Sequence, residues 1–198
     1  MAAIRLAIVL SFIALGLGAV YIFTMERAQP AGASSGEALI GGPFTLTSHT
    51  GETLTDQSFA GKAMLIYFGF TFCPDVCPTE LQKLSAALDQ LSESERKKIA
   101  PLFITIDPER DSVAAMADYV GHFHPDLVGL TGTQDAIKQA ASAYRIYYEK
   151  VEDDSSTAGY TMNHTNLIYV MDQNHKFVTV ITAEDGPDKI VKVIKEQL

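Results

Sequence analysis

Cysteine, basic side chains and charged residues in general are scarce in this sequence. The 198 residues include only two cysteines, which excludes a small scaffold held together by several disulfides. Lysine and arginine total 15 against 24 acidic residues, and the resulting net charge of −9 argues against nucleic-acid binding, which depends on cationic attraction to phosphate. With 20% charged and 47% hydrophobic residues, the chain is too apolar to be disordered. Its length favours one medium-sized domain.

The N-terminal residues form a separate apolar segment. From Leu6 to Phe23 no residue is charged and most are apolar, which is about the minimum length for a transmembrane helix, and Tyr21 lies where an interfacial aromatic would sit. The run is long for a cleaved signal peptide, although the small residues Ala31 and Ala33 leave cleavage open as the alternative. No cysteine lies near the start, which excludes a lipoprotein. We therefore expect a transmembrane anchor in residues 1–25.

Charge and composition around this segment predict how the rest of the chain is arranged. Arg5 precedes the apolar run, whereas Glu26 and Arg27 cancel after it, which favours a short cytoplasmic start. Residues 26–42 are rich in alanine, glycine and serine and predict a flexible tether. Residues 43–198 are then expected to fold as one globular domain near the outer face of the membrane.

Apolar periodicity predicts alternating strands and helices through most of this domain. The turn residues 49–51 separate two short segments and predict a small hairpin. Ala63–Phe70 and Leu102–Ile106 are near-continuous apolar runs, which is typical of strands buried on both faces. Apolar residues at helical spacing predict three helices, at Leu81–Leu91, Val113–Val120 and Asp135–Tyr144. A further short apolar run predicts one more strand, at Leu127–Leu130.

The C-terminal part has a different rhythm. Asn166–Met171 and Phe177–Ile181 are apolar strands whose connecting turn is too short for a crossover helix, so they must be antiparallel neighbours. Pro187 then opens a final amphipathic helix. The order strand, helix, strand, helix, hairpin, helix predicts an α/β, thioredoxin-like fold with a mixed central sheet and flanking helices on both faces.

The two cysteines lie at the first strand-to-helix turn, in the segment TFCPDVCP. Asp75 is expected to cap the helix, which puts Cys77 in its first turn and Pro78 where the missing N–H costs nothing. A helix N-terminus stabilises a thiolate, so we expect a lowered pKa for Cys77, and the flanking prolines and charge favour exposed thiols. The spacing brings Cys73 within reach of Cys77 for a disulfide or a shared metal. A structural disulfide and two inert buried thiols are the alternatives.

A metal site needs a further ligand, and histidine is the obvious candidate. Four of the five histidines lie in predicted turns or loops and are most simply interpreted as solvated, although an H-x-H pair is able to bind metal: His49, His122, His124 and His175. His164 differs because it follows an acidic, serine-rich loop at Glu152–Ser156 and directly precedes a buried strand. Two thiolates and an imidazole favour Cu(I), also hold Cu(II), and exclude Mg²⁺ and Ca²⁺, whereas Zn²⁺ would normally want a fourth ligand.

Three spaced segments carry a family resemblance: YFGFTFCPDVCP (Tyr67–Pro78), DPERD (Asp107–Asp111) and YTMNHTNLIYVMD (Tyr160–Asp172). In these segments the chain resembles the Sco/SenC family of membrane-anchored, thioredoxin-fold copper proteins, and with the anchor and strand order the resemblance spans nearly the whole chain. Asp107, Arg110 and Asp111 resemble a turn that the family has near its metal site. The alternative is a plain strand-to-helix turn in which Asp111 or Ser112 caps the helix.

The resemblance implies that residues 43–198 bind copper, as Cu(I) or Cu(II), through Cys73, Cys77 and His164. It implies a metallochaperone that helps to assemble the binuclear copper centre of cytochrome c oxidase, with the copper-accepting subunit of that oxidase as partner. Other copper chaperones or thiol reductases are further partners that it implies. It also implies a single-pass protein of a bacterial inner membrane whose soluble domain faces the periplasm.

Two residues depart from the family pattern. Phe72 stands where the family often has histidine, and Asn163 precedes His164 where aspartate is common. An aspartate beside a ligand favours Cu(II) over Cu(I), so we expect the neutral Asn163 to weaken that preference. The alternative is that Asn163 points away from His164, as neighbours in an extended segment do.

The cysteine pair also supports a different function. A thiol–disulfide oxidoreductase would use Cys73 and Cys77 as its catalytic pair to reduce the cysteines of a copper-accepting partner. Thiol exchange needs no distant histidine, which favours the copper interpretation, whereas the fold and the helix-terminal Cys77 are typical of reductases. A peroxidase of the same fold is disfavoured because nothing in the sequence identifies a peroxide-binding site.

Overall fold

The computed structural model describes residues 40–153 and 159–198. The expected anchor at residues 1–25 and most of the expected tether at 26–42 lie outside the described residues. Within these two described ranges, no helix is long and apolar enough to cross a membrane.

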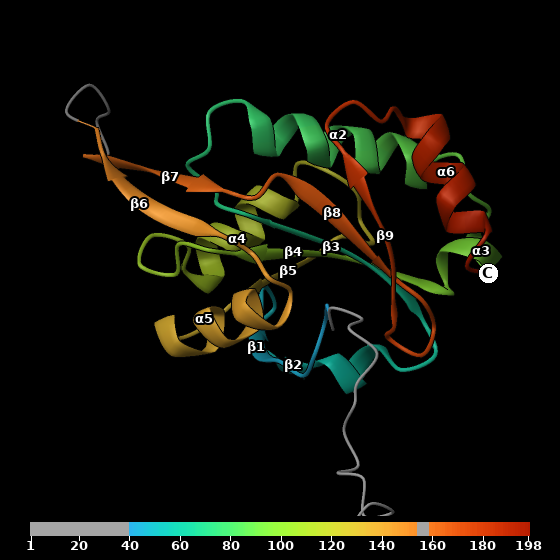
Figure 1. Ribbon diagram of the computed structural model, residues 1–198, viewed down its shortest axis with the longest axis horizontal. Helices are drawn as coiled ribbons and strands as arrows, with labels where there is room; N and C mark the ends of the chain where they lie inside the picture. The colour runs from blue at the N-terminus through green and yellow to red at the C-terminus, as the bar shows by residue number, and fades with distance from the viewer. Residues whose placement is uncertain (1–39, 154–158) are drawn as a thin grey trace, which may run out of the picture. The chain divides into compact units, whose positions relative to one another are not determined.

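A mixed seven-stranded sheet forms the centre of the domain, in the order β2–β1–β5–β4–β3–β8–β9 (Figure 1). Its strands are β1 (Thr45–Ser48), β2 (Thr53–Thr55), β3 (Ala63–Gly69), β4 (Ile99–Thr105), β5 (Val128–Thr131), β8 (Leu167–Met171) and β9 (Phe177–Thr182). β3 pairs in parallel with β4 and antiparallel with β8. Every residue of β3 and β4 is buried, which confirms the two buried strands predicted from their apolar runs.

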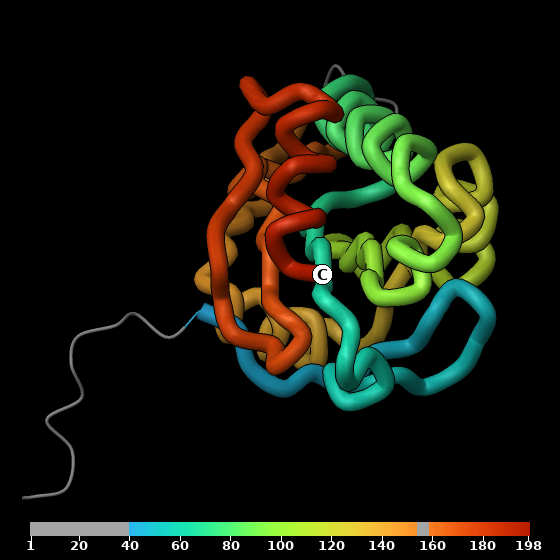
Figure 2. The backbone as a smooth tube through the Cα atoms, turned by 90° about the vertical axis from the view of Figure 1, so that its right-hand side faces the viewer, coloured from blue at the N-terminus to red at the C-terminus, as the bar shows by residue number. Residues whose placement is uncertain are grey.

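Helices cover both faces of this sheet. They are α2 (Val76–Leu88), α4 (Val113–Val120), α5 (Gln134–Ala143) and α6 (Pro187–Lys195), with the single turns η1 (Asp56–Phe59) and α3 (Glu93–Arg96). On one face, Phe103 of β4 packs 5.4 Å from Tyr119 of α4, between ring centroids. On the other, Phe68 of β3 packs against Tyr144, the C-cap of α5. α2 and α6 lie side by side in both views (Figures 1 and 2). The predicted α/β, thioredoxin-like arrangement is confirmed.

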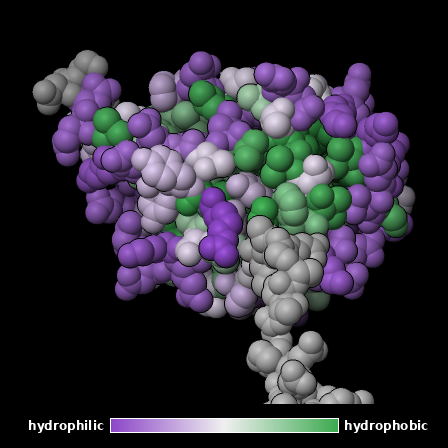
Figure 3. Space-filling model, in the orientation of Figure 1, coloured by the Kyte–Doolittle hydropathy of each residue, from purple (hydrophilic) through white to green (hydrophobic). Residues whose placement is uncertain are grey.

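The last two strands form the predicted antiparallel pair. β8 and β9 are in register from Leu167 opposite Thr182 to Met171 opposite Phe177, with a bulge near the turn. Apolar side chains gather over this pair on the face shown in Figure 3. Phe177 and Val178 of β9 are each more than a third exposed. Hydrophilic side chains cover most of the rest of that face, in keeping with an acidic surface.

A second, two-stranded sheet was not predicted. β6 (Tyr148–Glu152) and β7 (Tyr160–His164) pair antiparallel and reach out from the main sheet (Figure 1). Glu152 was expected in an acidic loop, but this residue ends β6 opposite Tyr160. No residue of β6 is fully buried, so the strand lacks the apolar alternation by which half-buried strands are recognised.

The chain has four histidines besides His164, and three of them are not simply solvated. His49 accepts a hydrogen bond from the backbone N–H of Gly129 through Nδ1, at 3.1 Å. His175, at a positive φ of 60°, lies with Nε2 3.2 Å from the carbonyl oxygen of Phe59. Only His122 is exposed, as expected, so the H-x-H pair does not form a joint site.

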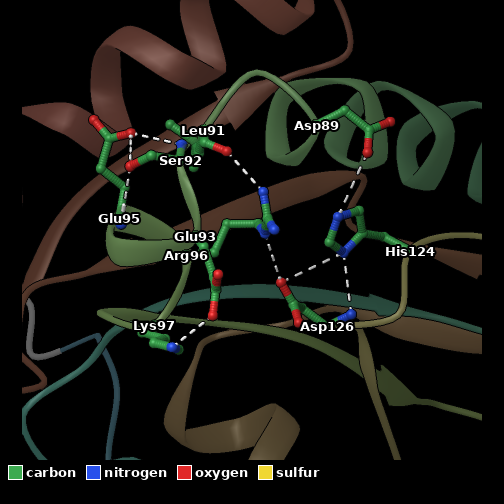
Figure 4. Close-up of polar contacts among 9 residues, drawn as sticks. All are labelled: Asp89, Leu91, Ser92, Glu93, Glu95, Arg96, Lys97, His124 and Asp126. Atoms are coloured by element: carbon green, nitrogen blue, oxygen red, sulfur yellow. Dashed lines mark hydrogen bonds and ion pairs between the residues drawn. The ribbon is translucent and has the colours of Figure 1, made fainter.

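His124 is buried and connects the end of α2 to the segment that precedes β5 (Figure 4). Its Nδ1 accepts from the backbone N–H of Asp126 at 3.0 Å, which leaves Nε2–H directed at Asp89, 3.6 Å away. The carboxylate of Asp126 in turn accepts from Arg96 at 3.1 Å (Figure 4). The interpretation of His124 as a solvated loop residue is wrong, because its hydrogen bonds make it part of the fold.

We expect His124→Ala to lower the free energy of unfolding by about 1–3 kcal/mol, since it removes a buried side chain together with the hydrogen bond that this side chain accepts from Asp126. The exposed His122→Ala variant is the matched control and should stay within about 0.5 kcal/mol of the parent chain. Denaturant unfolding followed by circular dichroism compares the two. Equal stability of both variants would contradict a structural role for His124.

Candidate metal centre

The cysteine loop follows β3 and leads directly into α2. Asp75 is the N-cap residue of α2, as predicted, but its side chain accepts no hydrogen bond from the helix backbone. Instead, the sulfur of Cys73 accepts from the backbone N–H of Cys77 at 3.3 Å. A thiolate therefore takes the position that a capping oxygen usually occupies at the first turn of a helix.

Cys77 lies fully buried against the end of β3. A Cβ at Gly69 would lie 2.9 Å from the sulfur of Cys77 and 2.8 Å from the ring of Phe103. Both distances are shorter than side chains tolerate, so glycine at this position makes room for the thiol. Cys73 is only partly buried, so the expectation of two exposed thiols holds for neither residue in full.

His164 reaches the cysteines from the end of β7. Its Nε2 lies 3.6 Å from the sulfur of Cys77, although the two residues are 87 positions apart in the chain. Its Nδ1 lies 2.9 Å from the carbonyl oxygen of Thr165 and donates to it, since a carbonyl only accepts. The lone pair of Nε2 is thereby left free and directed toward the thiols.

The three residues singled out by sequence thus lie together. A pocket of about 320 Å³ opens beside them and is bordered by Cys73, His164 and Asn166. Cys77 lies beneath this pocket and does not line it. Access from solvent is therefore through Cys73 and His164.

The two thiols have opposite acidities. Hydrogen bonding from Cys77 lowers the pKa of Cys73 to about 4, with a further contribution from His164 and against the effect of burial. Hydrogen bonding to Cys73 and burial raise the pKa of Cys77. The expectation of a lowered pKa at Cys77 is wrong, because the proximity of Cys73 and the loss of hydration outweigh the helix N-terminus. One proton stays on the buried sulfur and the accessible sulfur is the thiolate.

The DPERD turn (Asp107–Asp111) holds both the cysteine loop and β7, the strand that carries His164. Asp111 is buried and accepts hydrogen bonds from the backbone N–H and hydroxyl of Thr71, at 3.1 and 2.6 Å, and from the hydroxyl of Thr105 at 2.5 Å. Burial raises the pKa of Asp111, while these hydrogen bonds oppose the shift. Ser112, not Asp111, caps α4 by accepting from the backbone N–H of Ala115. Asp111 therefore fixes the start of the cysteine loop.

Arg110 connects the cysteine loop to β7. It pairs with the buried carboxylate of Asp107 and donates to the carbonyl oxygen of Tyr160 at 3.0 Å. Its guanidinium carbon lies 3.6 Å from the ring centroid of Tyr160 and 4.8 Å from that of Phe72. Tyr160 also donates to Asp107, and burial together with this bond raises the pKa of Tyr160 to about 12. The role of Arg110 in holding β7 was not predicted, because β7 itself was not.

The two departures from the family pattern lie at the edge of the site. Phe72 is 56% exposed and rests on Arg110. Asn163 is exposed, lies opposite Glu149 in the β6–β7 ladder and precedes His164 in an extended strand. Successive side chains of a strand project to opposite faces, but Asn163 lines the same pocket as Cys73 and His164, so its effect on the copper preference stays a prediction.

A thioredoxin-like fold with two thiols and an imidazole at the end of its central strand defines a thiol- or metal-handling protein of the thioredoxin-like class. Within that class, the SCO1/SenC family matches residues 32–198. The chain belongs to this family, and the resemblance seen in the three sequence segments is confirmed.

Individual relatives agree with this assignment. The chain is 39% identical over 196 residues to "Protein SCO1 homolog 1, mitochondrial" of Arabidopsis thaliana, covering 92% of this chain and 58% of that protein. It is 33% identical over 201 residues to "SCO2-like protein RC0895" of Rickettsia conorii, covering 98% and 97%. Bradyrhizobium japonicum ScoI, solved with copper bound, aligns with a TM-score of 0.74 at 42% identity, over 80% of this chain and 99% of that one. The chain spans 48% to 66% of the mitochondrial relatives from Arabidopsis, human and yeast.

We expect Cys73 to be the reactive thiol. At a pKa of about 4 it is ionised throughout the neutral range, so its alkylation by iodoacetamide should proceed at nearly equal rates at pH 6 and pH 8. Cys77→Ser removes the thiol that contributes most to this shift, so the rate at pH 6 should fall relative to that at pH 8. Alkylation rates are measured at the two pH values, and peptide mapping of the alkylated parent chain identifies the labelled cysteine. Preferential labelling of Cys77 would contradict the assignment.

Proposed function

We propose that this protein is a copper metallochaperone that carries copper as cargo on Cys73, Cys77 and His164. The observation that carries the proposal is the 3.6 Å approach of His164 Nε2 to Cys77 Sγ, beside a Cys73 whose thiol is already ionised. Thiolates are the ligands that Cu(I) prefers, and imidazole suits both copper oxidation states. A disulfide oxidoreductase alone gives no reason for an imidazole aimed at its buried cysteine.

The spacing of the donors fits a shared metal ion. Metal–sulfur and metal–nitrogen bonds of about 2.3 and 2.0 Å at a tetrahedral angle would separate the donors by about 3.5 Å, close to the distance between Cys77 Sγ and His164 Nε2. Nevertheless, the described part of the chain holds no group of three or more His, Cys, Asp or Glu side chains that as it stands could hold a metal ion.

The cargo is delivered, in this proposal, to the copper-accepting subunit of cytochrome c oxidase, where it contributes to the binuclear copper centre. Family membership and the copper-bound Bradyrhizobium relative support this role. The net charge of −9 suits partners with basic patches. Other copper chaperones or thiol reductases that load or reduce the site are further partners in this proposal.

The acidity of the thiols also favours a second function, reduction of a disulfide in the copper-accepting partner. The Cys73 thiolate attacks one partner sulfur, the partner disulfide breaks, and the leaving thiolate takes a proton. Cys77 then loses its proton and attacks Cys73, so the second partner thiol leaves and a Cys73–Cys77 disulfide forms. Two electrons pass to the partner. The buried, protonated Cys77 suits the resolving role and Cys73 the attacking one.

Ligand variants of the purified, reduced full-length chain separate these functions. We expect one copper per chain in the parent protein, and none after Cys73→Ser or Cys77→Ser, which should also abolish disulfide exchange. His164→Ala should weaken Cu(II) binding by at least about tenfold, and Cu(I) binding less, because the two thiolates remain. Its thiols should still form a disulfide.

Competition against chelators measures copper affinity, and thiol titration follows exchange. His122→Ala is the control, since this exposed histidine lies away from the cysteines, and it should bind copper normally. Equal loss of thiol exchange in His164→Ala would mean that the two activities do not separate as proposed.

For the location, we propose a single-pass inner-membrane protein of a bacterium, anchored by residues 1–25, with residues 43–198 in the periplasm. The uncharged run from Leu6 to Phe23 supports the anchor. Carbonate washing should therefore leave the protein in the membrane fraction. A membrane-impermeant thiol reagent should label Cys73 once the outer layer is permeabilised. Recovery of a soluble form that begins near Ser34 would show that the segment is a cleaved signal instead.

A further inference from the structure

β7, the strand that carries His164, does not by itself hold this residue against the main sheet. His164 is the last residue of β7, and in the described part of the chain β7 pairs only with β6, outside the main sheet. The bond from Nδ1 goes to the next carbonyl along the chain, that of Thr165. This bond sets the imidazole relative to its local backbone. The N–H of Thr165 donates to the carbonyl oxygen of Tyr147 at 2.9 Å, and the N–H of Tyr147 donates to the hydroxyl of Thr165 at 3.1 Å. These bonds join the segment 164–166 to the start of β6 and not to the main sheet.

The side chain of Asn166 connects that segment to the centre of the domain. Tyr67 of β3 donates its hydroxyl to Oδ1 of Asn166 at 2.9 Å, across 99 residues of sequence. Tyr67 is fully buried, and its ring lies beside Gly69 together with the sulfur of Cys77. The same strand, β3, therefore contacts the buried thiol and carries Tyr67, which holds the segment 164–166.

Two aromatic edges restrict the imidazole further. The ring of Tyr67 meets that of His164 at 71° with centroids 6.2 Å apart, and the ring of Phe70 meets it at 87° and 5.9 Å. Edge-to-face contacts of this kind favour one orientation of the ring over its flipped or rotated alternatives. With Nδ1 also held, Nε2 is directed at Cys77.

We propose that Tyr67 and Asn166 are positioning residues that hold His164 within bonding range of a metal on Cys77, and so set the preference of the site for Cu(II). The proposal rests on the copper function proposed above. Cu(I) is satisfied by two thiolates, whereas Cu(II) needs the imidazole, so losing the Tyr67–Asn166 bond weakens Cu(II) binding selectively. Outer hydrogen bonds of this kind typically change metal affinity by roughly 10-fold to 100-fold.

The test uses Tyr67→Phe, Asn166→Ala and the double variant of the full-length chain. Tyr67→Phe keeps the ring and removes only the hydroxyl. We expect each single variant to lose roughly tenfold in Cu(II) affinity with a smaller change for Cu(I), and to change the Cu(II) hyperfine coupling in electron paramagnetic resonance. Both substitutions remove the Tyr67–Asn166 bond, and Tyr67→Phe also removes the hydrogen bond between this hydroxyl and Cys77. The double variant should therefore be no worse than Tyr67→Phe alone.

Tyr144→Phe is the matched control, since it removes another buried tyrosine hydroxyl on the opposite face of the sheet. This variant should keep the Cu(II) spectrum and the Cu(II) affinity of the parent chain even if its folded state is less stable. A purely structural role for the Tyr67–Asn166 bond would lower the unfolding midpoint of Tyr67→Phe and leave its Cu(II) spectrum and affinity like those of Tyr144→Phe, and this result would overturn the proposal.

A readout without copper keeps the proposal separate from the proposed function. Nuclear magnetic resonance of histidine-labelled, copper-free protein reports the tautomer and mobility of His164. The parent chain should show one ordered ring protonated at Nδ1, and both single variants should show a mobile ring or mixed tautomers. If the parent chain binds no copper, the copper function fails while this measurement still decides the positioning. An unchanged imidazole signal in both variants would overturn it.

Discussion

The packing of one sulfur atom against one glycine sets the geometry of this site. Cys77 lies in the first turn of α2, and its sulfur occupies the space that a side chain at Gly69 would fill. This contact fixes the distance between the end of β3 and the helix that follows it. The cysteine loop then folds back so that Cys73 accepts from the N–H of Cys77. The opposite pKa shifts of the two thiols follow from this close approach, since only the accessible Cys73 remains hydrated when it ionises.

Two buried carboxylates connect this arrangement to the rest of the domain. Asp111 holds the loop that precedes Cys73 through the N–H and hydroxyl of Thr71. Asp107 acts through Arg110, which reaches β7 at the carbonyl of Tyr160. A short acidic turn after β4 thus holds the thiol-bearing loop with one residue and the histidine-bearing hairpin with another. Neither carboxylate needs to touch a metal ion to affect the site.

The sequence predicted best those features that a continuous local pattern carries. β3 and β4 were recognisable because helices cover both faces of the sheet and every residue in them is apolar or buried. β6 and β7 were missed because their strands are partly exposed and depend on distant contacts such as Arg110 with Tyr160. The candidate ligands were found from residue type and the family segments. The acidities of the thiols were not predictable, because they depend on the distance between Cys73 and Cys77.

The three donor residues are unequally buried, which sets the order in which another protein can reach them. His164 is carried by a hairpin that stands apart from the main sheet, Cys73 faces the pocket, and Cys77 has no accessible surface. In the copper function proposed above, an incoming thiolate from another protein would meet His164 and Cys73 first, so a bound ion would leave these two donors before it leaves Cys77.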